Sequence, residues 1–287
     1  TTSESTTVIA KDKKGNQVVV PGGFKISSAS GESVQQGIVI EDKDGNQFVW
    51  VPVDTIADYK RTAYSTNVAT EETDTATNSI KIKPTSLSSY YFTEALPEDE
   101  KTSVERYKGF YIGRYEAGDK ESTEAKTFRS EDDITKTVTI KAGQVPYNYI
   151  SQTDSVNVAS EFGTKQGYKA KTKLTSGYAW VAAIKFIQKV YSDYGSNSPQ
   201  GNYAGVDAFD YTDINGKKQN GKGVLMPTGQ TTPVCNIYDM GGNVGEWTTE
   251  SSSNTYYPYT RRGGSCFSGF AGYPAGYRYD DSDPARA

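Results

Sequence analysis

The chain contains no histidine. Because histidine is the commonest general base and the commonest transition-metal ligand in proteins, its absence excludes histidine-dependent catalytic triads, zinc sites and haem sites. Cysteine is scarce as well: Cys235 and Cys266 are the only two, and they lie too far apart for a CxxC motif. A dithiol redox site or a thiolate metal site therefore has no support, and the spacing leaves open whether the two cysteines pair or stay free.

Long apolar runs and an excess of basic residues are missing too. The formal net charge is -4 and the sequence pI is about 5.2, so no diffuse positive field exists to hold a phosphate backbone. No apolar run reaches membrane-spanning length, and the first five residues lack the features of a signal peptide. We expect no nucleic-acid partner and no membrane span; an export signal or anchor would have been removed or would lie outside this sequence.

Glycine and tyrosine, by contrast, are abundant. The 287 residues include 28 Gly and 22 Tyr but only 2 Met. This composition is typical of a polar, loop-rich β scaffold, and we expect an extracellular or cell-surface protein. A chain of this length can form one large domain with a small appendage. We predict an N-terminal β extension over residues 1–46 and one main domain over residues 47–287.

Two short segments near the N-terminus echo each other. Residues 12–17 read D-K-K-G-N-Q and precede three valines, while residues 42–47 read D-K-D-G-N-Q and precede F-V-W-V-P. Gly15 and Gly45 can adopt the positive φ that tight hairpin turns need, and β-branched residues follow where a strand should begin. Each segment predicts a β-hairpin. Whether they are a true duplication or two turns of a common type stays open.

The middle of the chain carries the helix signals. Residues 57–105 are rich in Thr, Ser, Asp and Glu, which predicts loops. Alternating apolar and polar residues over 109–116 predict a half-buried strand. Two helices should follow: one that Asp154 or Ser155 caps and that ends by Gly167, and a second that Ser176 caps and that keeps one face apolar.

The most specific motifs lie near the C-terminus. Residues 236–247 read N-I-Y-D-M-G-G-N-V-G-E-W, and residues 262–265 read R-G-G-S. This pair resembles the signature of the formylglycine-generating-enzyme family, N-x-x-G-N-x-x-E-W followed by R-G-G-S. Upstream, residues 48–52 and 109–116 resemble the first two strands of the family, and Trp180 stands where the family's L-P-T-E-A-E-W helix has its tryptophan. The resemblance covers all but the N-terminal extension.

The resemblance implies an α+β, C-type-lectin-like fold with two helices, a small twisted antiparallel sheet and much irregular structure. It also implies a structural calcium ion, bound by Asn243, by the carbonyl of Val244 and by Glu246. Calcium is a hard cation with flexible coordination, so an oxygen-rich turn suits it. The alternative is that Asn243 and Glu246 only hydrogen-bond the turn and its neighbours. Trp180 and Trp247 should belong to the core.

The catalytic features of this family are missing. Its oxidase members hold copper with two cysteines a few residues apart, shortly after R-G-G-S, because thiolates select Cu(I). Here only Cys266 follows Ser265, and Cys235 lies upstream of the predicted calcium turn. The iron-dependent relatives need histidine ligands. These departures predict a protein that is not an enzyme and holds no copper, iron or zinc.

From Ser251 to the end the chain has no Lys, Glu, Gln, Met, Trp, Leu, Ile or Val. Such a region cannot form ordinary core, yet it combines aromatic rings with small residues, as antibody paratopes do. We predict that residues 251–287 bind a ligand. The candidate site residues are Tyr256, Tyr257, Tyr259, Phe267, Phe270, Tyr273, Tyr277, Tyr279, Asp280 and Asp281. For some rings, Tyr277 and Tyr279 above all, the alternative is packing at alternate positions of a terminal strand.

Every residue type from Ser251 onward can also be encoded by a triplet ending in C with any first two bases. Adenine-directed mutagenesis leaves this footprint, and the region resembles the variable region of C-type-lectin-fold proteins diversified by retroelements. Undiversified relatives carry similar tails, so both origins stay open. The family normally closes with a strand of G-F-R-like sequence. This chain ends at Pro284-Ala285-Arg286-Ala287 instead, which leaves open whether its C-terminus is complete.

The sequence therefore favours a non-enzymatic ligand-binding protein of the adhesin or receptor-binding type. Its partner would be a protein or glycan on another cell or molecule. One alternative is a copper-dependent formylglycine-generating oxidase. Another is a calcium-dependent glycan-binding lectin, which ranks third because the sugar-calcium motifs E-P-N, Q-P-D and W-N-D are absent.

Overall fold

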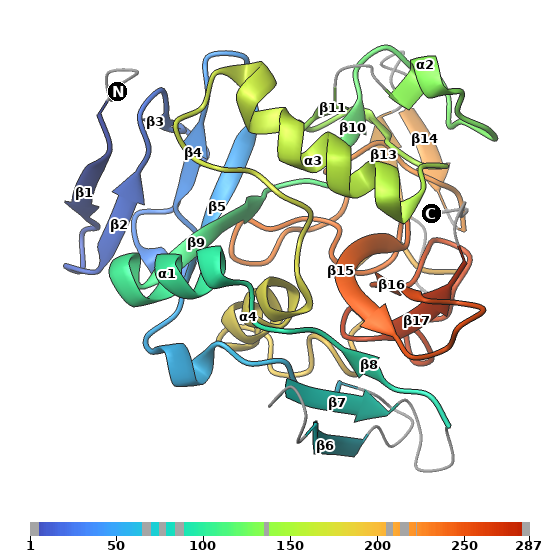
Figure 1. Cartoon of the computed structure of the whole chain (residues 1–287). Coiled ribbons are helices and arrows are strands. Elements are labelled where there is room, and N and C mark those ends of the chain that lie inside the picture. The colour runs from blue at the N-terminus through green and yellow to red at the C-terminus, as the bar shows by residue number, and fades with distance from the viewer. Residues whose placement is uncertain are drawn as a thin grey trace.

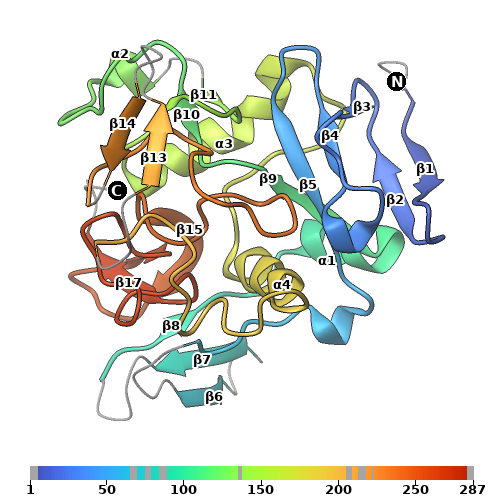
Figure 2. The same cartoon turned by 180° about the vertical axis from the view of Figure 1, so that it is seen from behind.

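The structure is a computed structural model that describes residues 6–64, 70–74, 79–83, 89–134, 138–204, 209–212, 218–221 and 223–282. This part of the chain contains four α-helices and several small antiparallel sheets, so the α+β class is confirmed (Figures 1 and 2). In both views the N-terminal hairpin and the C-terminal strands lie at opposite ends of the molecule. The terminal residues 1–5 and 283–287, on which the expectations about the chain ends were based, lie outside the described residues.

Both predicted hairpins form. Strand β1 (Val8–Lys11) pairs with β2 (Gln17–Val20), and β4 (Val39–Glu41) pairs with β5 (Gln47–Pro52). The glycines of the two turns, Gly15 and Gly45, have φ angles of 86° and 85°. A side chain in this left-handed region would be strained, so glycine is the residue that the turn requires.

One aspartate organises each turn in the same way. Asp12 accepts the backbone amides of Lys14 and Asn16, each at 2.8 Å. Asp42 accepts the amides of Asp44 at 2.9 Å and Asn46 at 2.8 Å. In both turns the asparagine side chain also donates to the aspartate, at 2.8 Å. The two segments are therefore alike in geometry as well as in sequence.

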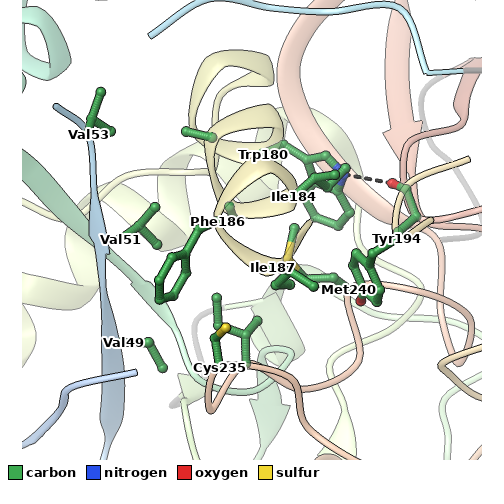
Figure 3. Close-up of a cluster of buried hydrophobic side chains, with 14 of the residues drawn as sticks. Val49, Val51, Val53, Trp180, Ile184, Phe186, Ile187, Tyr194, Cys235 and Met240 are labelled. Atoms are coloured by element: carbon green, nitrogen blue, oxygen red, sulfur yellow. Dashed lines mark hydrogen bonds between the residues drawn. The ribbon is translucent and has the colours of Figure 1, made fainter. Parts of the chain in front are cut away.

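A four-stranded sheet carries the main core. Its order is β3 (Lys25–Ile26), β4, β5 and β9 (Gly109–Gly113), so the strand predicted over 109–116 is confirmed for its first five residues. Figure 3 shows Val51 of β5 facing Phe186 of helix α4 (Gly177–Gln188), and Val49 and Val53 belong to the same buried cluster. The sequence placed a domain boundary between residues 46 and 47, and that position lies inside the β4–β5 hairpin.

Two helices cover this region, as expected, and side-chain caps start both. The cap of α3 (Gln152–Gln166) is Ser151 and not the expected Asp154 or Ser155: its side chain accepts the amide of Asp154 at 3.0 Å. Ser176 accepts the amide of Ala179 at 2.9 Å and begins α4. Because a cap oxygen satisfies an otherwise unpaired helical N–H, these serines fix where the helices start. The predicted core residues Trp180 and Trp247 are 2% and 5% exposed, which confirms their place.

The expectation of loops over residues 57–105 was wrong in part. This segment supplies helix α1 (Glu98–Tyr107) and three strands, β6 (Thr70–Asp74), β7 (Ser79–Lys83) and β8 (Phe92–Thr93). Few apolar anchors are needed here: Ile82, Phe92 and Val104 are almost completely buried. Glu98 and the two acidic residues after it form the first turn of α1, where negative charge is favourable.

The three strands join a second, six-stranded sheet. Its order is β17, β16, β15, β8, β7 and β6. The C-terminal half consists of β15 (Glu246–Ser252), β16 (Tyr259–Arg262) and β17 (Arg278–Asp281). Residues far apart in sequence therefore meet beside the predicted binding region. Ser251 and Ser252 of β15 pair with β8.

Smaller elements complete the chain. A three-stranded sheet consists of β11 (Val138–Thr139), β10 (Gly118–Asp119) and β12 (Val145–Pro146), and a short helix α2 (Glu131–Ile134) lies nearby in sequence. Strands β13 (Phe209–Thr212) and β14 (Lys218–Gly221) pair with each other in antiparallel fashion. Across the described residues, no helix is long and apolar enough to cross a membrane.

Candidate functional site

The C-terminal region presents large aromatic side chains to solvent. Tyr256 is 82% exposed and Phe267 is 78% exposed, and three other predicted site residues, Tyr257, Tyr273 and Tyr279, are exposed as well. Elsewhere among the side chains that the structure describes, the only aromatic ring of this kind is Phe128. Exposed aromatic surface is thus concentrated where the sequence predicted it.

Other predicted site residues hold the region together. Tyr259 packs edge-on against buried Trp247, with ring centroids 6.3 Å apart. Phe270 packs at the same distance and in the same edge-on manner against buried Tyr203. Both rings are only partly exposed, so they anchor the exposed segments to the core.

Three tyrosines form a continuous strip. The rings of Tyr273 and Tyr277 are 4.8 Å apart, and those of Tyr277 and Tyr279 are 6.5 Å apart. On β17 the side chain of Arg278 is buried and that of Tyr279 is exposed, and Tyr277 lies just before the strand. Tyr277 is half-buried between its two neighbours. The strip therefore has a packed centre and two exposed ends.

The two predicted acidic site residues already have partners. Asp280 accepts a hydrogen bond from the side chain of Asn254 at 2.8 Å. Asp281 forms an ion pair with Arg261. Arg261 also lies over the ring of Tyr279, 5.1 Å from its centroid. Through these contacts the two carboxylates hold the end of the tyrosine strip in place.

Beneath this surface lies a buried ionic cluster that sequence analysis missed. Glu250 is 1% exposed and accepts hydrogen bonds from three arginines. The distances are 2.6 Å to Arg61 Nη1, 3.1 Å to Arg262 Nη1 and 2.8 Å to Arg278 Nε. Arg262, the arginine of the R-G-G-S motif, also donates to the carbonyls of Gly276 and Tyr277 at 3.1 and 2.9 Å. The cluster therefore ties residues 276–278 to β15 and β16.

The charge of Glu250 is stabilised by its partners. Burial alone would raise the pKa of this carboxyl, but Arg278, Arg262 and Arg61 hold it at about 2. Glu250 is thus ionised at neutral pH. The signal that could have revealed the cluster is the presence of Arg262 and Arg278 in a region with no aliphatic side chains to form a core.

The predicted calcium turn is closed by hydrogen bonds. The side-chain oxygen of Asn243 accepts from Asn202 at 2.9 Å and from the amide of Met226 at 3.0 Å. Its side-chain amide donates to Glu116 at 2.6 Å, and the backbone amide of Val244 donates to the same carboxylate at 3.2 Å. Sequence analysis missed Glu116, although it ends the segment 109–116 that was predicted as a strand.

In this arrangement the turn does not fit calcium. Both lone pairs of the Asn243 oxygen are engaged by N–H donors, so this atom is not free to bind a cation. No group of three or more acidic, cysteine or histidine side chains converges as a metal site within the described ranges. Calcium binding by Asn243, Val244 and Glu246 therefore stays a prediction, and it would require this turn to rearrange.

Three carboxyl groups lie close together behind the turn. Burial, together with the charges of Asp239 and Glu246, raises the pKa of Glu116. Burial and the charge of Asp239 raise the pKa of Glu246 to about 8. Burial also raises the pKa of Asp239, whose oxygens accept from Gly229 and Thr231 at 2.6 and 2.5 Å. By contrast, no hydrogen bond or ion pair from a described residue reaches the carboxyl of Glu246.

The two cysteines are free and buried. Burial raises the pKa of the Cys235 thiol to about 11. Burial, with the charge of Glu116, raises the pKa of the Cys266 thiol to about 11 as well. Because Cu(I) is bound by thiolates, these environments do not favour copper binding.

No protein-family model matches the chain, and no curated protein shows significant similarity to it.

Proposed function

We propose that the chain is a non-enzymatic binding module with a C-type-lectin-like fold of the formylglycine-generating-enzyme type. It acts outside the cell or at the cell surface, as an adhesin or receptor-binding protein. Its ligand is a protein or a glycan on another cell or molecule. The observation that carries this proposal is the concentration of exposed rings in residues 256–279, above the buried Glu250 cluster.

Physical chemistry supports this use of the surface. Exposed tyrosine and phenylalanine rings are costly to keep in water, and patches of them usually mark interaction sites. Each ring offers a large contact area with only two rotatable side-chain bonds, so little entropy is lost on binding. The anchors below, Tyr259 and Phe270, keep the exposed rings on a fixed backbone.

Two features of the chain argue against the iron-dependent and copper-dependent reactions of the formylglycine-generating-enzyme family. The chain has no histidine for an iron site. The thiols of Cys235 and Cys266 are buried and their pKa values are raised to about 11. A Cu(I) titration tests the oxidase alternative. We expect no stoichiometric copper uptake; uptake that depends on both cysteines, with turnover of a cysteine-containing peptide, would overturn the proposal.

Phe267 and Phe128 make a matched pair for testing the surface. They are 78% and 73% exposed, but only Phe267 lies in the C-terminal region. Once a ligand is found on a glycan array or in a display library of protein domains, Phe267→Ala and Tyr256→Ala should weaken binding by about 1–4 kcal/mol at hot spots. Phe128→Ala should leave the affinity unchanged. Equal effects of Phe128→Ala and Phe267→Ala, or none, would contradict the proposal.

The proposal includes diversification of residues 251–287 by a retroelement. It is supported by the restriction of this region to residue types with codons ending in C. The gene itself tests it: the genome should hold a near-copy of the coding tail that differs mainly at adenines. If the genome holds no such copy, residues 251–287 are not diversified, and the proposal is reduced to a binding module of fixed sequence.

The calcium-dependent lectin alternative has its own test. Glycan binding that is abolished by a chelator and restored by calcium would favour it over direct contact with the aromatic rings. We expect chelator to leave glycan or protein binding unchanged.

A further inference from the structure

A large cavity is lined by residues that precede the C-terminal region, and none of residues 251–287 contributes to its wall. Its volume is about 640 Å³, within the range of sites for small organic molecules. The segment that joins α3 to α4 runs along it and supplies residues 168–175 to its wall. In Figure 1 this connection crosses the space between β9 and β15, and Figure 2 shows the same arrangement from behind.

Part of the wall is apolar and part is acidic. The rings of Tyr238 and Trp247 and the side chains of Met240 and Val244 line the cavity, together with Glu116 and Glu246. Glu116 is engaged, because Asn243 and Val244 donate to its two oxygens. The carboxyl of Glu246, by contrast, receives no hydrogen bond from the residues described. It is the free polar group of this wall.

The acidic side of the cavity lacks a counter-ion. No lysine or arginine of the described chain forms an ion pair with Glu116, Asp239 or Glu246. Three lysines line the cavity: Lys173 is already paired with Asp99 and Glu100, at 3.0 Å from each, whereas Lys169 and Lys171 are exposed and form no ion pair with the three carboxyls. The Glu246 carboxyl therefore has room for a partner, and an ion pair with a bound cation would favour its ionised form.

The hydrogen bonds of Asn243 and the apolar side chains of the wall indicate which kind of cation fits this cavity. A calcium ion needs six to eight oxygen ligands, whereas the Asn243 oxygen is engaged by two N–H donors. An ammonium group needs fewer partners, and an attached apolar body can contact the methionine and aromatic side chains of the wall.

We infer that this cavity binds a compact organic ammonium ion with an aromatic or aliphatic body, and that Glu246 is its counter-ion. This site is independent of the proposed aromatic binding surface. Either can fail without affecting the other, because they are tested with different ligands and different variants.

The first test uses 2-phenylethylammonium as the probe and neutral 2-phenylethanol as its control. Calorimetry should show saturable binding of the ammonium and at least tenfold weaker binding of the alcohol. Glu246→Gln should weaken binding of the ammonium at least tenfold. The matched control is Glu98→Gln, because Glu98 is on the surface of α1 with a side chain 81% exposed, and this variant should bind like the wild type.

A second measurement does not depend on any variant folding. The chain has only two methionines, and Met240 lines the cavity whereas Met226 does not. With ¹³C-methyl methionine, the ring protons of the bound probe should give nuclear Overhauser effects to the Met240 methyl group and none to Met226.

Three results would overturn the inference. One is the absence of saturable binding by 2-phenylethylammonium. Another is equal affinity for the ammonium and the alcohol, which would indicate an apolar cavity without charge selection. The third is stoichiometric calcium binding that requires Glu246 and displaces the probe, which would make this carboxyl a metal ligand.

Discussion

The regions around α4 and around β17 each have a buried interior, yet these interiors are held by different forces. Around α4, side chains such as Ile184 and Ile187 pack against the valines of β5 and are completely buried. Around β17, Glu250 and three arginines occupy the interior. Apolar burial tolerates changes of shape, whereas a buried ionic cluster depends on every partner being present. The aliphatic-free tail is thus ordered by charge.

The variant Glu250→Ala tests the ionic region most directly and should have the largest effect. The substitution leaves Arg61, Arg262 and Arg278 buried without their shared counter-ion. We expect the free energy of unfolding to fall by about 3–5 kcal/mol. Urea denaturation measures it, with Glu124→Ala, at an exposed loop position, as a control that should change it by no more than about 0.5 kcal/mol. A loss below about 1 kcal/mol for Glu250→Ala would show that the cluster is dispensable.

Trp180→Ala tests the apolar side of the comparison. Trp180 is buried in the α4 core and donates through Nε1 to the carbonyl of Ala275 at 2.8 Å, so it joins the two regions (Figure 3). Truncation should cost about 3–5 kcal/mol of folding free energy. Trp180→Phe, which keeps an aromatic ring but loses the hydrogen bond, should cost less. Thermal and urea melts that show equal losses for both variants would assign the effect to the hydrogen bond instead of to packing.

Acid should weaken the ionic region selectively. The folded-state pKa of Glu250 is about 2, below its ordinary value of 4.5. Its stabilising contribution, about 3 kcal/mol, is therefore complete above about pH 5 and is lost as the pH falls toward 2. Between pH 5 and 2, the unfolding free energy of the wild type should fall more steeply than that of Glu250→Gln. Parallel curves would mean that Glu250 has no special part in acid unfolding.

The smallest expected effect is on the exposed rings. Tyr256→Ala and Phe267→Ala remove side chains that are about four-fifths exposed, so stability should change by less than about 0.5 kcal/mol. Differential scanning calorimetry checks this. If either variant destabilises the fold by 2 kcal/mol or more, the ring is part of the structure, and the separation between scaffold and surface is lost.

Local signals explain what could be predicted from the sequence. The two D-K-x-G-N-Q turns and the cap at Ser176 were predicted because a few neighbouring residues determine each of them. Trp180 and Trp247 were predicted as core by motif and by residue type. The exposed rings were predicted from the lack of aliphatic neighbours that could bury them.

Long-range pairing explains what could not be predicted. Helix α1 has a single fully buried apolar side chain, Val104, and its apolar partners come from other elements. Likewise, no local pattern distinguishes buried Arg61 or Glu250 from arginines and glutamates on a surface, because their burial depends on contacts between distant segments. The hydrogen bonds that close the Asn243 turn also come from distant residues, Asn202 and Glu116.

The sequence separations in these contacts bear on the order of folding. Each aspartate turn closes across four residues, so both hairpins can form early and with little loss of chain entropy. The ion pair between Arg61 and Glu250 spans 189 residues, and such contacts form late because a long loop must close first. The contacts beneath the aromatic face should therefore form after the hairpins, and a chain that stalls on the way would carry formed N-terminal hairpins without a usable binding surface.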